Sequence, residues 1–327
     1  MQGFDLQRES KNLAANLDDY LKSHFKKLVE HFVDCFSAYC EKIYQMQKQG
    51  EKGAIAYVHF SILRTNILLK KHELRLDAYD ERWYMDPVEC SGSYQVVEVY
   101  SYLEKFGDIV EQLRSKSGGK ISLVEAQKRV FTESNIYLFY IAELIRVGMR
   151  DVLQTEAYKR IERAPCFVVC IGGFLDRFDI LYKDDRTAKD SNEVKRYLQS
   201  KRKMLFSHEI FENLNLSNGN YEELEFQYSS FAGSDFTGSS WNKGRLLFSN
   251  FQNAILKDTK MEKMKIFDTD FSDATLEQVN FAGTKLKYIS FARAKLFQVD
   301  FSKALLAEEI NFQDAQIVDC KLPEVRR

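Results

Sequence analysis

Hydrophobic residues follow two different periods along this chain. Up to about residue 182, apolar side chains recur every three or four positions, as they do on one face of an α-helix. From residue 211 onward they recur at every fifth position. A charged segment with few large apolar residues, 183–203, lies between the two patterns. We therefore divide the chain into an α-helical domain at 1–182, a connector and amino-terminal cap at 183–210, and a repetitive domain at 211–327.

The first pattern predicts a bundle of about six helices. The first helix shows it best, because residues 13–36 place leucine and phenylalanine at helical spacing (Leu13, Leu17, Leu21, Phe25, Leu28, Phe32 and Phe36). Further helices are expected at 54–69, 94–114, 122–131, 133–160 and 165–182. The segment before Pro87 alternates briefly and predicts extended chain.

The period of five in the second half fits neither a helix nor a strand. Five steps of 100° spread the apolar residues around a helix, and an odd spacing alternates between the two faces of a strand. A coil that turns by about 90° every five residues keeps them on one side, together with a small residue two positions earlier. Four units close a turn of about 20 residues, and stacked turns pair their backbones at ~4.8 Å.

A period of twenty residues can be checked directly, because like residues should then stack in columns. One column is almost entirely phenylalanine and continues after a one-residue slip at 307–312: Phe231, Phe251, Phe271, Phe291 and Phe312. The next contains Tyr221, Trp241, Met261, Phe281 and Phe301. A third contains Phe226, Leu246, Ile266, Leu286 and Leu306. The pattern therefore predicts a solenoid.

Residues 212–322 resemble the pentapeptide repeat family, whose unit is written A(D/N)LXX. Matching units are "ATLEQ" from Ala274, "AKLFQ" from Ala294 and "VDFSK" from Val299, whereas "GRLLF" and "MKIFD" carry a cation before the central residue. The resemblance implies a right-handed quadrilateral β-helix. The expected fold class is thus α+β with two domains, an amino-terminal α-helical bundle followed by this β-helix.

The family's best-known members bind type II topoisomerases as DNA mimics and protect them from inhibitors. A mimic needs a dense acidic face to imitate phosphates. Residues 211–327 carry 17 acidic against 14 basic side chains, and the acids are scattered over different columns. A protection factor of this kind remains the alternative to a non-catalytic interaction or regulatory protein that uses the solenoid as a binding scaffold.

Cations are ordered more regularly than acids. Arg245, Lys265 and Lys285 are spaced by twenty, and a parallel column two residues away is interrupted by Gly283. The candidate partner-binding residues are Lys243, Arg245, Lys263, Lys265, Lys285, Lys287 and Lys303. They form either a docking edge for an acidic partner, which we expect to be a protein, or a solubilising guard against edge association. Because the stripe shows no interleaved exposed aromatic residue, we do not expect direct nucleic-acid binding.

Catalytic chemistry has little support in the sequence. His72, Glu73, Asp77, Asp80 and Asp86 lie near Trp83, but no HExxH, Walker or nucleophile-elbow spacing is present. We therefore assign no catalytic residue, cofactor or metal. Six scattered cysteines indicate reduced thiols, the first twelve residues lack the apolar core of a signal peptide, and the longest apolar run is too short to span a membrane. These features predict a cytoplasmic protein without a membrane partner.

The last rungs of the solenoid expose an apolar cross-section. Only five residues follow Leu322, too few for a helix that could cover the end. We therefore expect a weak to moderate homodimer in which the carboxy-terminal rungs of two chains meet. The predicted dimer-interface residues are Leu306, Phe312, Ile317 and Leu322.

Overall fold

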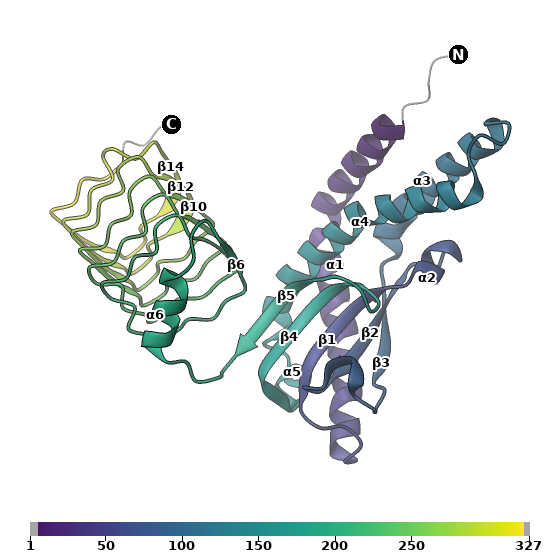
Figure 1. Ribbon diagram of the computed structural model, residues 1–327, viewed down its shortest axis with the longest axis horizontal. Coiled ribbons are helices and arrows are strands. Elements are labelled where there is room, and N and C mark those ends of the chain that lie inside the picture. The colour runs from purple at the N-terminus through teal and green to yellow at the C-terminus, as the bar shows by residue number, and fades with distance from the viewer. Residues whose placement is uncertain (1–5, 324–327) are drawn as a thin grey trace. The chain divides into compact units, whose positions relative to one another are not determined.

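The computed structural model describes residues 6–323 and contains two compact units, residues 1–184 and 185–327 (Figure 1). Each unit encloses its own main hydrophobic core. The first combines helices with a mixed sheet, and the second is a β-solenoid.

The first unit places three long helices beside a five-stranded sheet (Figure 1). The strands lie in the order β3-β2-β1-β4-β5, with β1 parallel to β4 and antiparallel to β2. The elements are α1 (Leu6–Lys48), β1 (Ile55–Ile62), α2 (Arg64–Leu68), β2 (Glu73–Tyr79), η1 (Trp83–Met85), β3 (Ser91–Gln95), α3 (Val97–Lys116), α4 (Leu123–Val152), α5 (Glu156–Arg160), β4 (Arg163–Gly173) and β5 (Phe178–Asp185).

The α+β class is confirmed, but the prediction of an all-helical first domain was wrong. The helices expected at 54–69 and 165–182 are β1 with α2, and β4 with β5. Both central strands are buried on their two faces, so their sequences are nearly continuous apolar runs. Such a run does not distinguish a buried strand from a buried helix by period. The helices expected at 122–131 and 133–160 are mainly the single helix α4.

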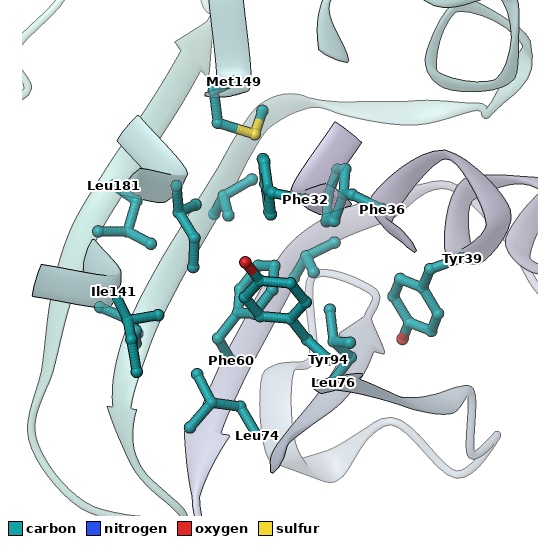
Figure 2. Packing of buried hydrophobic residues seen from close by; sticks show 14 of the residues in the cluster. Phe32, Phe36, Tyr39, Phe60, Leu74, Leu76, Tyr94, Ile141, Met149 and Leu181 are labelled. Atoms are coloured by element: carbon teal, nitrogen blue, oxygen red, sulfur yellow. The ribbon is translucent and has the colours of Figure 1, made fainter. Parts of the chain in front are cut away.

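The main core of this unit lies between the helices and one face of the sheet (Figure 2). Phe32 and Phe36 of α1 pack on Phe60 of β1, with ring centroids 6.1 and 5.7 Å apart. Met149 of α4 and Tyr94 of β3 belong to the same cluster. Burying these aromatic side chains together with the aliphatic ones supplies hydrophobic free energy that holds the helices on the sheet.

The opposite face of the sheet carries polar residues under the segment that contains η1. His59 pairs in register with Cys170 on β4 and with Asp77 on β2, so the three side chains share this face. His59 is fully buried, and its Nδ1 lies 3.1 Å from the hydroxyl of Tyr84. Burial lowers the pKa of His59 to about 4. The imidazole is therefore neutral at neutral pH.

The second unit begins with α6 (Ser191–Gln199), whose Leu198 is buried in the solenoid core. One face stacks six strands, in the order β14-β12-β10-β8-β7-β6, and another stacks four, β15-β13-β11-β9. The strands are β6 (Leu205–Ser207), β7 (Glu225–Gln227), β8 (Arg245–Leu247), β9 (Ile255–Lys257), β10 (Lys265–Phe267), β11 (Thr275–Glu277), β12 (Lys285–Ser290), β13 (Lys295–Phe297), β14 (Leu306–Asn311) and β15 (Gln316–Val318).

The predicted columns are confirmed in the solenoid core, except that Leu306 does not continue the column of Leu286. Phe271 stacks between Phe251 and Phe291, with ring centroids 5.0 and 5.3 Å away, and Phe291 stacks on Phe312 at 5.6 Å. Where the small residue two positions before each central residue is serine or threonine, its hydroxyl also forms a hydrogen bond with the backbone. The hydroxyl of Thr284 donates to the carbonyl of Met261 at 2.7 Å. Such bonds satisfy backbone groups at the buried corners.

The slip in the repeat lies earlier than predicted. Leu306 pairs with Lys285, and Ala307 takes the place opposite the buried Leu286. The extra residue therefore enters before Leu306 rather than at 307–312, and Leu306 does not continue the column of Leu286. Leu305 is 62% exposed, as expected for a side chain displaced outward where an extra residue interrupts the pairing.

We predict that acid destabilises the first unit through His59. Its folded pKa lies below the ordinary value of about 6.5, so the unfolded state binds the extra proton between pH 6.5 and pH 4. Stability should fall as pH decreases through this window, by about 3 kcal/mol at pH 4. Urea unfolding followed through Trp83 fluorescence, in a Trp241→Phe background, measures the effect. His59→Gln should flatten the dependence and exposed His24→Gln should not; equal slopes for all three proteins would contradict the assignment.

Phe271→Ala should destabilise the solenoid by roughly 3–5 kcal/mol, because it empties space between two stacked phenyl rings. The matched variant is Phe248→Ala, since Phe248 is 50% exposed and its removal opens no buried cavity. It should change stability by less than about 0.5 kcal/mol. Both are measured by urea unfolding through Trp241 fluorescence in a Trp83→Phe background. Similar losses for the two variants would show that the alternation of buried and exposed positions is wrong.

Candidate interaction surface of the solenoid

The residue before each central residue has a different role at the turns of the solenoid and on its strand faces. Where Asp or Asn precedes the central residue, its side chain accepts a hydrogen bond from the backbone N–H two positions on. Asp270 accepts from Ser272 at 2.8 Å, and Asp300 accepts from Ser302 at 2.9 Å. These carboxylates and amides stabilise tight turns, which explains the D/N position of the repeat. On the strand faces no such turn is needed, and the same position is available for other side chains.

The predicted cations lie on one strand face and its corner. Arg245, Lys265 and Lys285 pair in register on β8, β10 and β12, so their stacking is confirmed. Lys243 and Lys263 occupy the preceding corner with φ of 64° and 57°. Gly283 follows in that column with φ 71°, and a Cβ there would lie only 3.0 Å from Lys263. We call this surface the basic face: Lys243, Arg245, Lys263, Lys265, Lys285 and Lys287, with Lys303 one rung further.

Two members of the basic face are already neutralised by neighbouring rungs. Arg245 forms an ion pair with Glu225, and Lys287 lies 3.1 Å from Glu308. The other five are exposed lysines without an ion pair to any residue in 6–323: Lys243, Lys263, Lys265, Lys285 and Lys303. These lysines are the part of the surface that can pair with an outside anion.

Exposed aromatic residues border the basic face, contrary to the expectation from sequence. Phe248 directly follows β8, and Tyr288 lies within β12. Both are at the corner beyond the cations, where they are 50% and 52% exposed. Phe248 stacks on Tyr228 of the rung below, with ring centroids 5.0 Å apart and nearly parallel planes. The ammonium of Lys287 lies 5.1 Å from the ring of Tyr288. The surface therefore offers both positive charge and apolar contact area.

This aromatic column was missed because only inward positions and cations were compared at the period of twenty. The same period, applied to the residue two positions after the strand centre, gives His208, Tyr228, Phe248, Asp268 and Tyr288. All five have positive φ, so they lie at equivalent corners. The signal was available in the sequence.

The predicted dimer-interface residues divide into two groups. Ile317 and Leu322 are 38% and 48% exposed, and Phe312 is half-buried against the core. Leu306 is displaced from the inward position, as described above. Among residues 6–323, β14 and β15 are the outermost strands of their sheets. Residues 324–327 lie outside the described part of the chain.

The acidic and basic groups around Trp83 are bonded to partners within the chain. Asp77 binds Arg75 at 2.8 Å, Asp86 binds the buried Lys52 at 2.6 Å, and Asp80 binds Arg82 at 2.5 Å. His72 lies against Glu104 of α3 instead. Glu73 accepts a hydrogen bond from the side chain of Gln95 at 2.9 Å, and the amide of Asp80 donates to the carboxylate of Asp86 at 2.8 Å. These carboxylates therefore serve contacts within the fold. Within residues 6–323 no group of three or more His, Cys, Asp or Glu could hold a metal ion, and no helix is long and apolar enough to cross a membrane.

Stacked five-residue units with this register define a pentapeptide-repeat solenoid. The family model "Pentapeptide repeat region" matches residues 234–312. That stretch of the chain is thus a pentapeptide repeat region, as the resemblance implied.

Several solved structures are similar to the solenoid. A pentapeptide repeat protein from the thylakoid lumen of Arabidopsis thaliana is 20% identical over 33% of this chain and 73% of that chain, with a TM-score of 0.29. HetL is a protein of the cyanobacterium Nostoc sp. strain PCC 7120 involved in heterocyst differentiation regulation. It is 12% identical over 41% of this chain and 95% of its own, with a TM-score of 0.23. QnrB1, a plasmid-mediated fluoroquinolone resistance protein, is 13% identical over 36% of this chain and 65% of its own, with a TM-score of 0.24. No curated protein sequence matches the chain.

Proposed function

We propose that this protein is a non-catalytic interaction or regulatory protein whose solenoid docks an acidic partner protein on the basic face. The observation that carries the proposal is the combination of unpaired lysines on successive rungs with exposed aromatic rings beside them. Lysines alone would serve equally well as a solubilising guard. Exposed Phe248 and Tyr288 would oppose that purpose, because apolar side chains promote association.

The charge pattern also supports docking on a limited part of the solenoid. Glu223 and Glu225 lie one rung below Lys243 and Arg245, and Glu308 and Glu309 lie at the other end of the face. The positive potential is therefore confined to a few rungs. Complementary charge would steer an acidic surface to this region, and contact with the rings would then slow its dissociation.

A DNA-mimicking protection factor fits the surface less well. Acidic side chains of the solenoid are commonly paired with cations on the next rung. Asp273 binds Arg293 at 2.6 Å, Asp300 binds Lys321 at 3.0 Å, and Glu277 binds Lys257 at 3.1 Å. Others are engaged in turns. These pairings leave no continuous acidic column to imitate a line of phosphates.

Reversing two charges in the middle of the basic face should abolish docking. Lys263→Glu with Lys265→Glu changes the local charge by four units on exposed side chains, so binding should fall at least tenfold while the melting temperature stays nearly constant. The measurement is crosslinking and affinity capture from the native cell with the full chain as bait, followed by titration of the captured partner.

The matched control is Lys260→Glu with Lys295→Glu, which makes the same charge change at exposed positions outside the basic face. Partners retained by the control and lost by the first variant support the proposal. Equal retention by both variants at physiological salt would reject the docking role. Capture of single-stranded nucleic acid in place of a protein would also overturn the assignment of the partner class.

We also propose that the outermost rungs associate with a second copy of the chain. Ile317, Val318 and Leu322 are 38–48% exposed, and the outer edges of β14 and β15 are unpaired within the described residues. An exposed edge with apolar side chains is a template for pairing with another chain. The end of the solenoid is small, so the dimer should be of weak to moderate affinity.

Sedimentation velocity from about 1 to 100 µM tests this association. The wild-type chain should show a concentration-dependent increase in mass, and Leu322→Glu should remain monomeric because two buried carboxylates would face each other. Phe248→Glu, which adds the same charge away from this end, should dimerise normally. A wild-type monomer at 100 µM would exclude the proposed dimer.

A further inference from the structure

One position of the basic face carries no side chain. Lys263, Gly283 and Lys303 follow one another at the same corner on successive rungs. The amide of Lys263 donates to the carbonyl of Ala282, and the amide of Gly283 donates to the carbonyl of Lys303, each at 2.9 Å. Neighbouring rungs are ~4.8 Å apart, so the backbones of Lys263 and Lys303 are about 10 Å apart. We call the space between these two lysines the Gly283 gap.

The backbone conformation does not require glycine at this corner. Gly283 has a φ of 71°, but Lys243 and Lys263 take similar values in the same column, and Phe248 takes 51° at the next corner. A Cβ on Gly283 would lie 3.0 Å from Cγ of Lys263, which belongs to a flexible side chain that can move aside. The effect of glycine here is therefore the open space beside a partly exposed backbone.

Two further lysines lie beside the Gly283 gap. Lys265 and Lys285 are partners in the register of β10 and β12. Each is separated from the corner by one inward residue, Met264 and Thr284 respectively, and both of these are buried. Lys265 and Lys285 are exposed and, like the two lysines of the corner, form no ion pair with any residue in 6–323. Four unpaired ammonium groups therefore surround the gap.

Acidic side chains near the Gly283 gap do not neutralise it. Asp300 pairs with Lys321 at 3.0 Å, and Glu262 accepts a hydrogen bond from the side chain of Asn280 at 3.0 Å. Asp268 lies across the face at the aromatic corner and forms no ion pair with the described residues. The four cations repel one another at neighbouring rungs. A concentrated negative charge from outside would relieve this repulsion.

A phosphate monoester supplies such a charge better than a carboxylate does. It carries about −1.5 to −2 charge units at pH 7 and three acceptor oxygens, whereas a carboxylate carries a single charge. Lysine places its ammonium group on a flexible four-carbon stem, so several lysines can converge on one phosphate. Carboxylates on an ordinary acidic surface are held apart by their own backbone and cannot gather in one gap.

The limited extent of the charge favours a single phosphate over a nucleic-acid strand. A strand carries its phosphates singly charged and in a continuous line, and it needs a basic groove of matching length. The unpaired lysines extend only from Lys243 to Lys303, three rung spacings or about 14 Å. Glu223 occupies the same corner on the rung below Lys243. On the other side of the face, exposed Tyr288 offers an apolar contact to residues that flank the phosphate.

We propose that the Gly283 gap binds a phosphoserine or phosphothreonine side chain of the partner protein. The phosphate oxygens contact the ammonium groups of four lysines: Lys263, Lys265, Lys285 and Lys303. Neighbouring residues of the partner contact the ring of Tyr288. This inference rests on the docking function proposed above, and it adds that docking depends on phosphorylation of the partner.

Peptides that differ at a single residue test the proposal on the full-length protein by fluorescence anisotropy. Each carries fluorescein and has the sequence Leu-Ala-Ala-X-Ala-Ala-Leu, where X is phosphoserine, glutamate or serine. The phosphoserine peptide should bind saturably and at least tenfold more tightly than the glutamate peptide, because phosphate brings additional charge and a third acceptor oxygen. The serine peptide should bind more weakly than either. Inorganic phosphate should compete with the phosphoserine peptide, and a labelled thymidylate heptamer should bind more weakly than that peptide.

Two variants examine the geometry of the site. Gly283→Leu fills the gap with a side chain that donates no hydrogen bond, and it should lower the affinity for the phosphoserine peptide at least fivefold. Its matched control is Gly238→Leu, at another corner with a φ of 70°, which should bind as the wild type does. Lys285→Gln removes one of the four charges and should weaken binding at least threefold. Lys295→Gln, at an exposed position outside the basic face, should not.

Equal affinity for the phosphoserine and glutamate peptides, or no saturable binding of the phosphoserine peptide, would overturn the proposal. Tighter binding of the thymidylate heptamer would overturn the assignment to a phosphoprotein. Unchanged affinity of both Gly283→Leu and Lys285→Gln would reject the site. If Gly283→Leu does not fold, Lys285→Gln decides, because an exposed lysine is replaced without a change in packing.

Affinity capture from the native cell separates this proposal from the docking function on which it rests. Phosphatase treatment of the extract should abolish capture of the partner that Lys263→Glu with Lys265→Glu also loses. A partner that survives phosphatase treatment but is lost by the double variant would reject the phosphate and leave docking on the basic face intact. Capture that neither phosphatase nor the double variant reduces would reject both.

Discussion

The second unit depends on backbone pairing between residues twenty apart. The amide of Lys265 donates to the carbonyl of Gly244, and the amide of Lys285 donates to that of Met264, each at 3.0 Å. Because this ladder sets the register, each side chain before the extra residue at 305–306 lies above the one twenty residues earlier, inside and outside alike. Like charges stacked in this way repel each other. The backbone ladder therefore keeps Arg245, Lys265 and Lys285 in one column despite the repulsion between their charges. The unpaired lysines of this column remain available to an outside anion.

The solenoid could be predicted from sequence because its period matches neither regular element, whereas the sheet of the first unit could not. In β4 the side chains of Phe167 and Val169 face the helices, and those of Val168 and Cys170 face the segment around η1. Both sets are buried, so no alternation remains to reveal a strand. The slip was misplaced for a related reason. Leu305 and Leu306 are both suitable apolar residues, and the structure gives the central position to Ala307 instead.

Surface chemistry was only half predictable, because residue type does not determine exposure in a solenoid. Phe248 is 50% exposed and Phe251, three residues later, is fully buried. The two differ only in their place within the five-residue unit. The cations could be predicted because charged side chains are expected at the surface at any position. Aromatic side chains are usually expected in the core, so the exposed ones are recognised only from their position within the five-residue unit. A basic stripe interpreted without its aromatic border suggests a solubilising device, and with it suggests a docking surface.

The small hydrophobic cluster between α3 and α4 follows from the proportions of the first unit. A helix of 30 residues is about 45 Å long, and α3 and α4 extend together beyond the strands (Figure 1). Residues near the sheet, such as Tyr100 and Leu103, join the main core, while the distal parts must build their own from Phe106, Val110 and Ala126. A cluster of three buried residues gives little hydrophobic free energy. Leu6 and Leu13 of α1 pack against this small cluster as well, so the distal ends of α3 and α4 depend on a modest core to which α1 also contributes.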